Sequence, residues 1–204
     1  MKRIAILVSV LFFQVSVAGA ATAEGDTKPG LYLQGAFAMQ ATTGDLKKAI
    51  NELEADANFY GGSLAVGYFM TDWLALQARV QFLSGTGIGD TPNPANLDVS
   101  TYNVLYTGAV KLYPLALLTQ NAGGQIQPYA IFGIGGQSTL VSVDFFGTGT
   151  TAFLLEVGGG LDLMFNSNFG VFGEVTYNYL NNTNFGFSET ASAVGVNAGI
   201  TYHF

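Results

Sequence analysis

The chain ends in VGVNAGITYHF, residues 194–204, and this stretch decides the fold. Every second residue from Val194 to Phe204 is apolar, whereas the residues between them are glycine, asparagine, threonine and histidine. A period of two is typical of a β-strand, because successive side chains point to opposite faces of a sheet. The stretch therefore predicts a strand with one apolar face and one small, polar face. Soluble sheets also alternate in this way, so the rest of the chain must decide what each face contacts.

The charge content bounds the class of protein. Only 10% of the 204 residues are Asp, Glu, Lys or Arg, against roughly 25% in soluble domains, which is too little to cover a soluble protein. Beyond the amino terminus, no segment offers the roughly 18 consecutive apolar residues that a spanning helix needs. A closed β-barrel remains, because a chain in hydrocarbon must pair every backbone N–H and C=O. The absence of cysteine argues against a small disulfide-stapled scaffold.

The amino terminus has the form of a cleavable secretory signal. Two basic residues precede a short apolar run, which is followed by the small-residue motifs A-G-A and A-T-A. We expect a signal peptide over residues 1–23, cut near Ala20 or Ala23, and a single barrel domain over residues 24–204. An uncleaved anchor helix is the alternative, and the shortness of the run argues against it.

The mature chain is acidic. Of seven basic residues, two lie in the expected signal peptide, which leaves five against fourteen acidic residues and a net charge of −9. This charge disfavours nucleic acid and anionic lipid as partners.

Alternating apolar positions recur along the chain and predict eight strands. The connections after the second and sixth strands are short, near residues 70–72 and 166–168, whereas the predicted loops at 84–98 and 137–151 are long. Helical spacing over residues 45–57 predicts a short surface helix in the first loop. The face of the fifth strand stays open, because both of its faces are apolar or glycine. The predicted strands are residues 31–39, 61–69, 73–83, 100–113, 127–135, 152–165, 169–180 and 194–204.

Three motifs carry a resemblance to a known family. The segment GYFMTDWLAL, residues 67–76, resembles the second and third strands of small OmpA-like barrels, and QPYAIFGIG, residues 127–135, resembles their fifth strand. The ending Tyr202-x-Phe204 resembles the closing strand of these barrels. The resemblance to this porin-type outer-membrane family implies an all-β, eight-stranded antiparallel up-and-down transmembrane β-barrel in the bacterial outer membrane.

The same resemblance implies partners and a role. Tyr202 and Phe204 would form the signal read by the barrel assembly machinery, after delivery by periplasmic chaperones. The inserted protein would contact outer-membrane lipid and lipopolysaccharide, with its loops facing outside. Its role would be structural, or would be contact with a host or surface ligand through those loops. A narrow channel for small or apolar solutes, as in OmpW-like barrels, is the alternative.

The polar strand faces predict a packed lumen. A soluble eight-stranded barrel carries its apolar face inside, but here the polar face is too weakly charged to serve as an outer aqueous coat. Aromatic residues near the strand ends predict interfacial girdles. The expected girdle residues are Trp73, Tyr102, Tyr113, Phe165, Phe169, Tyr179 and Tyr202.

Five charged residues fall on the predicted lumen faces, where an unpaired charge would cost several kcal/mol. Their heights along the strands predict an Arg79–Glu174 pair across the barrel with Glu156 close by, and Lys111 with Asp162 nearer the periplasm. The network either satisfies a polar core or plugs and gates a pore.

The sequence predicts neither an enzyme nor a cofactor or metal site. The single histidine, His203, is expected at the periplasmic rim, and no H-x-S or G-x-S-x-G motif is present. A lipid-modifying enzyme is therefore the least supported function. The glycine runs at residues 133–136 and 158–160 lack the strand-to-helix context of a phosphate-binding loop, and we assign them to close strand packing. The acidic residues are scattered and predict no metal ligand cluster.

Overall fold

The computed structural model describes residues 30–43, 58–86, 99–118, 126–143, 146–182 and 189–204. The predicted signal peptide, residues 1–23, and the predicted surface helix, residues 45–57, lie outside this described part. No helix within it is long and apolar enough to cross a membrane.

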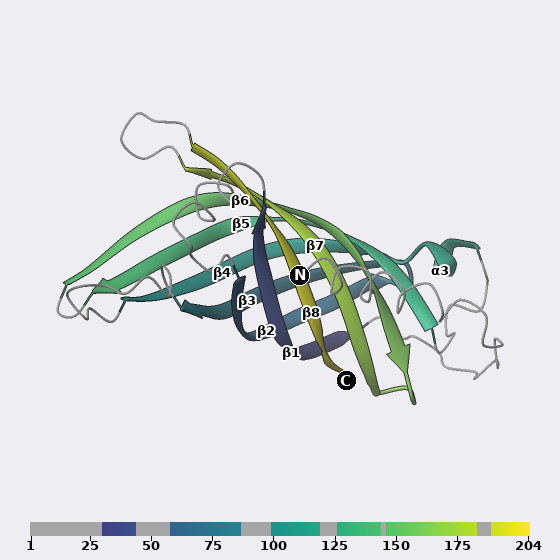
Figure 1. Cartoon of the computed structure of the whole chain (residues 1–204). Coiled ribbons are helices and arrows are strands. Elements are labelled where there is room, and N and C mark those ends of the chain that lie inside the picture. The colour runs from purple at the N-terminus through teal and green to yellow at the C-terminus, as the bar shows by residue number, and fades with distance from the viewer. Residues whose placement is uncertain (1–29, 44–57, 87–98, 119–125, 144–145, 183–188) are drawn as a thin grey trace, which may run out of the picture.

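Eight antiparallel strands form one closed barrel in chain order (Figure 1). The strands are β1 Leu31–Thr43, β2 Asn58–Thr71, β3 Leu74–Thr86, β4 Val99–Leu112, β5 Ile126–Val143, β6 Phe146–Met164, β7 Phe169–Asn182 and β8 Glu189–His203. The wall closes where β8 pairs with β1, from Tyr32 opposite His203 to Thr43 opposite Ser192. The predicted all-β, eight-stranded up-and-down fold is thus confirmed.

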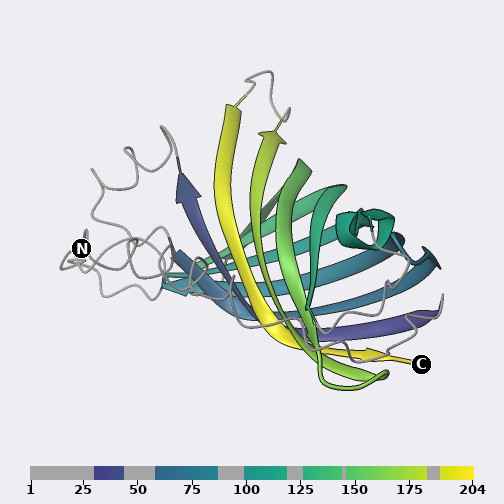
Figure 2. The ribbon, with the colours of Figure 1, turned by 90° about the vertical axis from the view of Figure 1, so that its right-hand side faces the viewer.

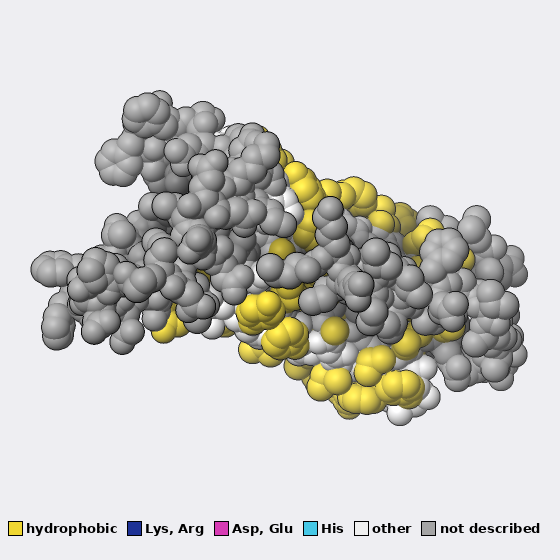
Figure 3. All heavy atoms as spheres, viewed as in Figure 1, with side chains coloured by type: hydrophobic (Ala, Val, Ile, Leu, Met, Phe, Trp, Pro, Cys, Tyr) yellow, Lys and Arg dark blue, Asp and Glu magenta, His cyan; other side chains and the backbone are white. Residues whose placement is uncertain are grey.

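The wall separates apolar from polar side chains. On the outside, Phe37, Leu64 and Phe82 are 59%, 68% and 59% exposed. Inside, Gln77 and Arg79 are both only 5% exposed. On the face shown in Figure 3, the described side chains in view are hydrophobic or uncharged. An apolar exterior around a polar interior is the arrangement of a transmembrane barrel and the reverse of a soluble one.

The structure fixes the face of β5, which the sequence left open. Tyr129 and Ile131 are buried in the lumen, whereas Phe132 and Ile134 are 50% and 61% exposed on the outer face. The large apolar residues of this strand therefore divide between the two faces, which is why its periodicity is weak.

Several strands continue past their predicted outer ends. The predicted loops at residues 84–98 and 137–151 are wrong at their edges, since β3 reaches Thr86, β5 reaches Val143 and β6 begins at Phe146. These outer segments are rich in serine, threonine and glycine. The apolar alternation stops at the edge of the outward apolar band, but the backbone pairing continues beyond it.

The first short turn is displaced from its predicted position. We expected a turn at residues 70–72 and a strand from Trp73, but β2 ends at Thr71, which pairs with Leu74, so Trp73 lies in the turn. The register shifts between Phe69 and Thr71. A β-bulge adds a residue to one strand, which moves the turn along the chain.

The barrel has one end with short turns, which such proteins place in the periplasm. The connection after β4 begins there with a short helix, α3 Pro114–Leu118. Figure 2 looks onto this end, with α3 and the carboxyl terminus towards the viewer. Ala116 of α3 packs against the side chains that fill the base of the lumen.

Two inward glycines allow neighbouring strands to approach closely. A Cβ atom on Gly135 would lie 1.9 Å from the backbone oxygen of Tyr106, and one on Gly199 would lie 2.0 Å from that of Gly35. Such glycines let a barrel wall bend sharply. The assignment of the glycine-rich segments to strand packing therefore agrees with the geometry at Gly135.

Candidate functional site

A layer of charged side chains crosses the middle of the lumen. Arg79 on β3, Glu156 on β6 and Glu174 on β7 are each 5% exposed or less. Arg79 Nη1 donates to Glu174 Oε1 at 2.5 Å, and Arg79 Nη2 donates to Glu156 Oε1 at 3.4 Å. The structure thus brings these three side chains into contact, and the guanidinium links strands on opposite sides of the barrel.

Glu174 is the centre of this layer. Besides Arg79, it accepts hydrogen bonds from Tyr129 Oη at 3.0 Å and from Asn197 Nδ2 at 3.3 Å. Lys111 Nζ lies 3.9 Å from Glu174 Oε2. Sequence reasoning missed Tyr129 because the face of β5 was open. Asn197 lies on the predicted lumen face of the last strand, so its phase could have identified it.

The predicted pairing of Lys111 with Asp162 is wrong in detail. Across the described residues, these two form no ion pair within 4.0 Å. Lys111 instead donates to Gln34 Oε1 at 3.1 Å and lies 4.2 Å from the ring centroid of Tyr129, while Asp162 Oδ2 accepts from Tyr113 Oη at 2.9 Å. Lys111 thus contacts Gln34, Tyr129 and Glu174, whereas Asp162 is hydrogen-bonded to Tyr113.

Aromatic side chains pack against one another at the base of the lumen. The ring centroid of Phe69 lies 5.2 Å from that of Tyr32 and 5.2 Å from that of Tyr113. The centroid of Tyr113 in turn lies 5.4 Å from that of Tyr129. The prediction that Tyr113 belongs to an interfacial girdle is wrong, because this residue is only 3% exposed. It lies two positions from Lys111 and therefore on the same inward face.

A second apolar layer lies in the lumen on the outer side of the charges. It consists of buried leucines that follow the charged positions towards the outer ends of their strands, together with Ala38. Leu83 lies beyond Arg79 on β3, and Leu154 lies beyond Glu156 on β6. The leucines are Leu83, Leu105, Leu154 and Leu180. Sequence reasoning missed this layer, although these isolated leucines all lie on polar strand faces.

His203 lies in an aromatic setting at the periplasmic end of β8. Its ring centroid is 5.7 Å from Tyr32 and 5.4 Å from Phe69. In the part of the chain that the structure describes, no three His, Cys, Asp or Glu side chains form a group that could hold a metal ion. The contacts that the structure shows for the His203 ring are with these two aromatic rings.

The two carboxyl-terminal aromatics lie on the outer face. Tyr202 and Phe204 are 45% and 66% exposed, with ring centroids 5.1 Å apart in an edge-to-face arrangement. The terminal backbone is anchored on both sides, since Phe204 N–H donates to Leu31 O at 3.0 Å and His203 N–H donates to Asn168 O at 2.7 Å.

The outer end of the barrel carries an uneven rim. β6 pairs with β5 from Phe146 onwards, but it pairs with β7 only from Phe153 to Met164. Among the described residues, the backbone of Phe146–Thr150 therefore pairs on the β5 side alone. Figure 1 shows the β5–β6 hairpin running to the left, away from the β7–β8 hairpin at the top.

A closed eight-stranded wall with an apolar exterior and a packed polar lumen defines a small transmembrane β-barrel. Residues 6–204 match the family model described as outer membrane protein beta-barrel domain, and the chain belongs to this family. It is an integral protein of the bacterial outer membrane, where its environment is lipid and lipopolysaccharide.

Three solved structures of similar fold are small outer-membrane barrels. Neisserial surface protein A is 17% identical, covers 86% of this chain and 97% of its own, and has a TM-score of 0.61. Ail, the attachment invasion locus protein of Yersinia pestis, is 14% identical over 87% of this chain and 100% of its own, with a TM-score of 0.55. OprG from Pseudomonas aeruginosa is 15% identical over 90% and 99%, with a TM-score of 0.51. Comparison with curated protein sequences gives no match. At these identities the likeness concerns the fold alone.

Proposed function

We propose that this outer-membrane barrel has a structural and surface-interaction role, in which its outer end contacts an external protein and its lumen stays closed. The observation that carries the proposal is the rim of β6, where, among the described residues, Phe146–Thr150 pair with β5 and not with β7. An edge strand presents backbone N–H and C=O groups to which an extended segment of another protein can add. The adhesin-like contact is therefore made by the backbone of the β5–β6 hairpin.

The charge of the chain favours a protein ligand over a polyanion. The structure of the relative Ail has been determined with the heparin analogue sucrose octasulfate. The present chain has a formal net charge of −7, which repels such a ligand. A protein segment that pairs with the backbone of the uncharged residues Phe146–Thr150 needs no positive charge on this chain.

Insertion is the second part of the proposal. The exposed rings of Tyr202 and Phe204, at the end of the strand that closes the barrel, are accessible to the barrel assembly machinery. We assign these two residues the role of assembly signal, with periplasmic chaperones delivering the chain. The charged lumen network around Arg79 is assigned a structural role.

The test removes the rim and leaves the barrel. Thr139 pairs with Thr150, so residues 140–149 can be replaced by Asn-Gly, which favours a tight hairpin turn. Cells that display the wild-type protein should adhere to a surface coated with serum proteins, and cells with the shortened hairpin should not. A boiled-versus-unboiled gel shift in both proteins controls for folding. Equal adhesion of the two strains would refute the role of the rim.

A narrow channel for small or apolar solutes is the alternative function. It requires a continuous path, whereas the described residues place an aromatic layer below the charged layer and a leucine layer above it. Conductance across a planar bilayer distinguishes the two functions. We propose no catalytic role, since His203 packs against rings in the lumen.

A further inference from the structure

The buried charges of the lumen do not balance. Among the described residues, two cationic side chains are buried, Arg79 and Lys111, against three carboxyl groups, Glu156, Asp162 and Glu174. With all five groups ionised, the lumen carries a net charge of −1. A buried charge without compensation is strongly destabilising, so such a group is paired with an opposite charge or neutralised.

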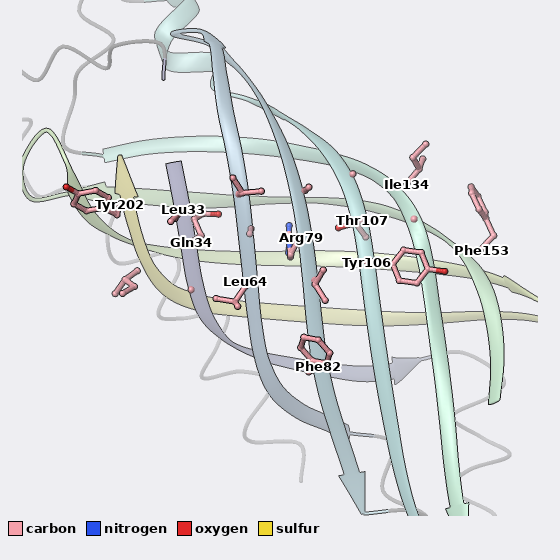
Figure 4. A pocket seen from close by; sticks show the side chains of 18 residues that line it. Leu33, Gln34, Leu64, Arg79, Phe82, Tyr106, Thr107, Ile134, Phe153 and Tyr202 are labelled. Atoms are coloured by element: carbon pink, nitrogen blue, oxygen red, sulfur yellow. The ribbon is translucent and has the colours of Figure 1, made fainter. Parts of the chain in front are cut away.

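Both cations lie against the two glutamates. Arg79 forms ion pairs with Glu156 and Glu174, and Lys111 Nζ lies 3.9 Å from Glu174 Oε2. Figure 4 shows Arg79 two strands away from Gln34, the residue that accepts a hydrogen bond from Lys111. The glutamates therefore use both positive charges of the lumen.

Asp162 is the carboxylate that remains. It is only 3% exposed, and across the described residues it forms no ion pair within 4.0 Å. Its Oδ2 accepts from Tyr113 Oη at 2.9 Å, but its Oδ1 has no hydrogen-bond partner in the described part of the chain. His203 does not supply the missing charge, since its ring packs against Tyr32 and Phe69.

We propose that Asp162 is the binding site of one small monovalent cation, a proton or an alkali ion, which balances the charge of the lumen. The unpartnered Oδ1 is the atom that takes up this cation. A divalent ion fits the charge poorly, because it would turn the net charge of the lumen from −1 to +1. Among the described residues, no group of three His, Cys, Asp or Glu side chains could hold such an ion.

The position of Asp162 gives the cation a source. This residue lies two positions before Met164, where β6 ends at the periplasmic side of the barrel, so the site exchanges ions with the periplasm. The ionisable groups that act on Asp162 are three tyrosines, which are uncharged at neutral pH, and one group of each sign, whose effects on a bound cation oppose each other. These groups are Tyr32, Tyr113, Tyr129, Lys111 and Glu174.

Asp162→Asn removes the site, and Asp72→Asn is the matched control. Asp72 is exposed in the turn after β2, so the same chemical change is made outside the lumen. The equilibrium constant of unfolding in urea is measured for the refolded proteins in detergent. One series varies the pH, and another replaces sodium chloride with tetramethylammonium chloride at equal ionic strength. A gel shift on boiling verifies that the proteins are folded.

The two series distinguish the two cations. An unfolded chain loses a proton from aspartate above roughly pH 4, so a folded state that keeps this proton becomes less stable as the pH rises. The unfolding constant of wild type and Asp72→Asn should then rise more steeply with pH than that of Asp162→Asn, by up to about tenfold per pH unit. If the cation is sodium, its replacement should destabilise wild type and Asp72→Asn at constant pH, but not Asp162→Asn.

Three results would overturn the proposal. The first is an identical dependence on pH and on sodium in wild type and Asp162→Asn. The second is an equal loss of dependence in both variants, because the effect would then not belong to the lumen. The third is an Asp162→Asn protein that does not fold, because asparagine gives the lumen the same charge as the occupied site.

Discussion

Arg79 is the residue on which the charged layer of the lumen depends. It contacts both Glu156 and Glu174, and its side chain is only 4% exposed. A buried ion pair contributes little net stability, but removal of one partner leaves the other charge without compensation. Two carboxylates would lose their main cation if Arg79 were removed.

We therefore predict that Arg79→Met destabilises the folded barrel by about 3–5 kcal/mol. The measurement is the free energy of unfolding in urea for the refolded protein in detergent. The double variant Arg79→Met with Glu174→Gln should recover part of the loss, because fewer unpaired charges remain buried. A single variant as resistant as wild type would show that the pairing contributes nothing.

Glycine substitutions distinguish a crowded wall from an open one. A Cβ at Gly199 would lie 2.0 Å from a backbone oxygen of Gly35, and backbone cannot give way as a flexible side chain can. Gly199→Ala should destabilise the barrel by about 1–3 kcal/mol. Gly108→Ala should be neutral or stabilising by about 0.5–1 kcal/mol, because alanine loses less entropy on folding. The same urea titrations measure both, and equal effects at the two positions would contradict the described packing.

At the scale of elements, β6 differs in pairing along its length. Residues Phe153–Leu163 pair on both sides, whereas Phe146–Thr150 pair with β5 alone among the described residues. Amides without a partner strand open at little cost in free energy. We predict slow hydrogen exchange throughout residues 153–163 and fast exchange at alternate amides of residues 146–150, measured by NMR in detergent micelles. Uniform protection along the whole strand would mean that the rim is not a free edge.

The strands show what the sequence could reveal. Alternation predicted all eight of them and the faces of seven, because a membrane imposes a strict period of two on every wall-forming segment. Their outer ends were underestimated, since Thr86 and Val143 lie where the apolar pattern has faded but backbone pairing persists.

Some side-chain contacts in the lumen were also predictable, because the strand alternation shows which residues point inward. The charges of Arg79 and Glu174 stand out on polar faces, so their approach could be inferred from phase and height. The position of Tyr113 was misread because its place at a strand end was given more weight than its phase. The partners of Lys111 could not be inferred, because they depend on how the rings of Tyr129 and its neighbours fill the interior.

At the scale of the whole molecule, the interior is built in layers. Aromatic rings fill the base beneath α3, the charged layer spans the middle, and buried leucines lie towards the outer rim. We propose that close packing of these layers leaves no continuous path for hydrated ions. The proposed interaction surface lies at the outer end of this layered interior, on the β5–β6 hairpin.

The central claim is that the folded barrel is closed. The most direct test is single-channel conductance in a planar bilayer, using protein whose gel mobility changes on boiling and which is therefore folded. We predict no steady openings, because apolar layers lie on both sides of the charged layer. Steady openings of reproducible size would contradict the closed lumen and make transport the function.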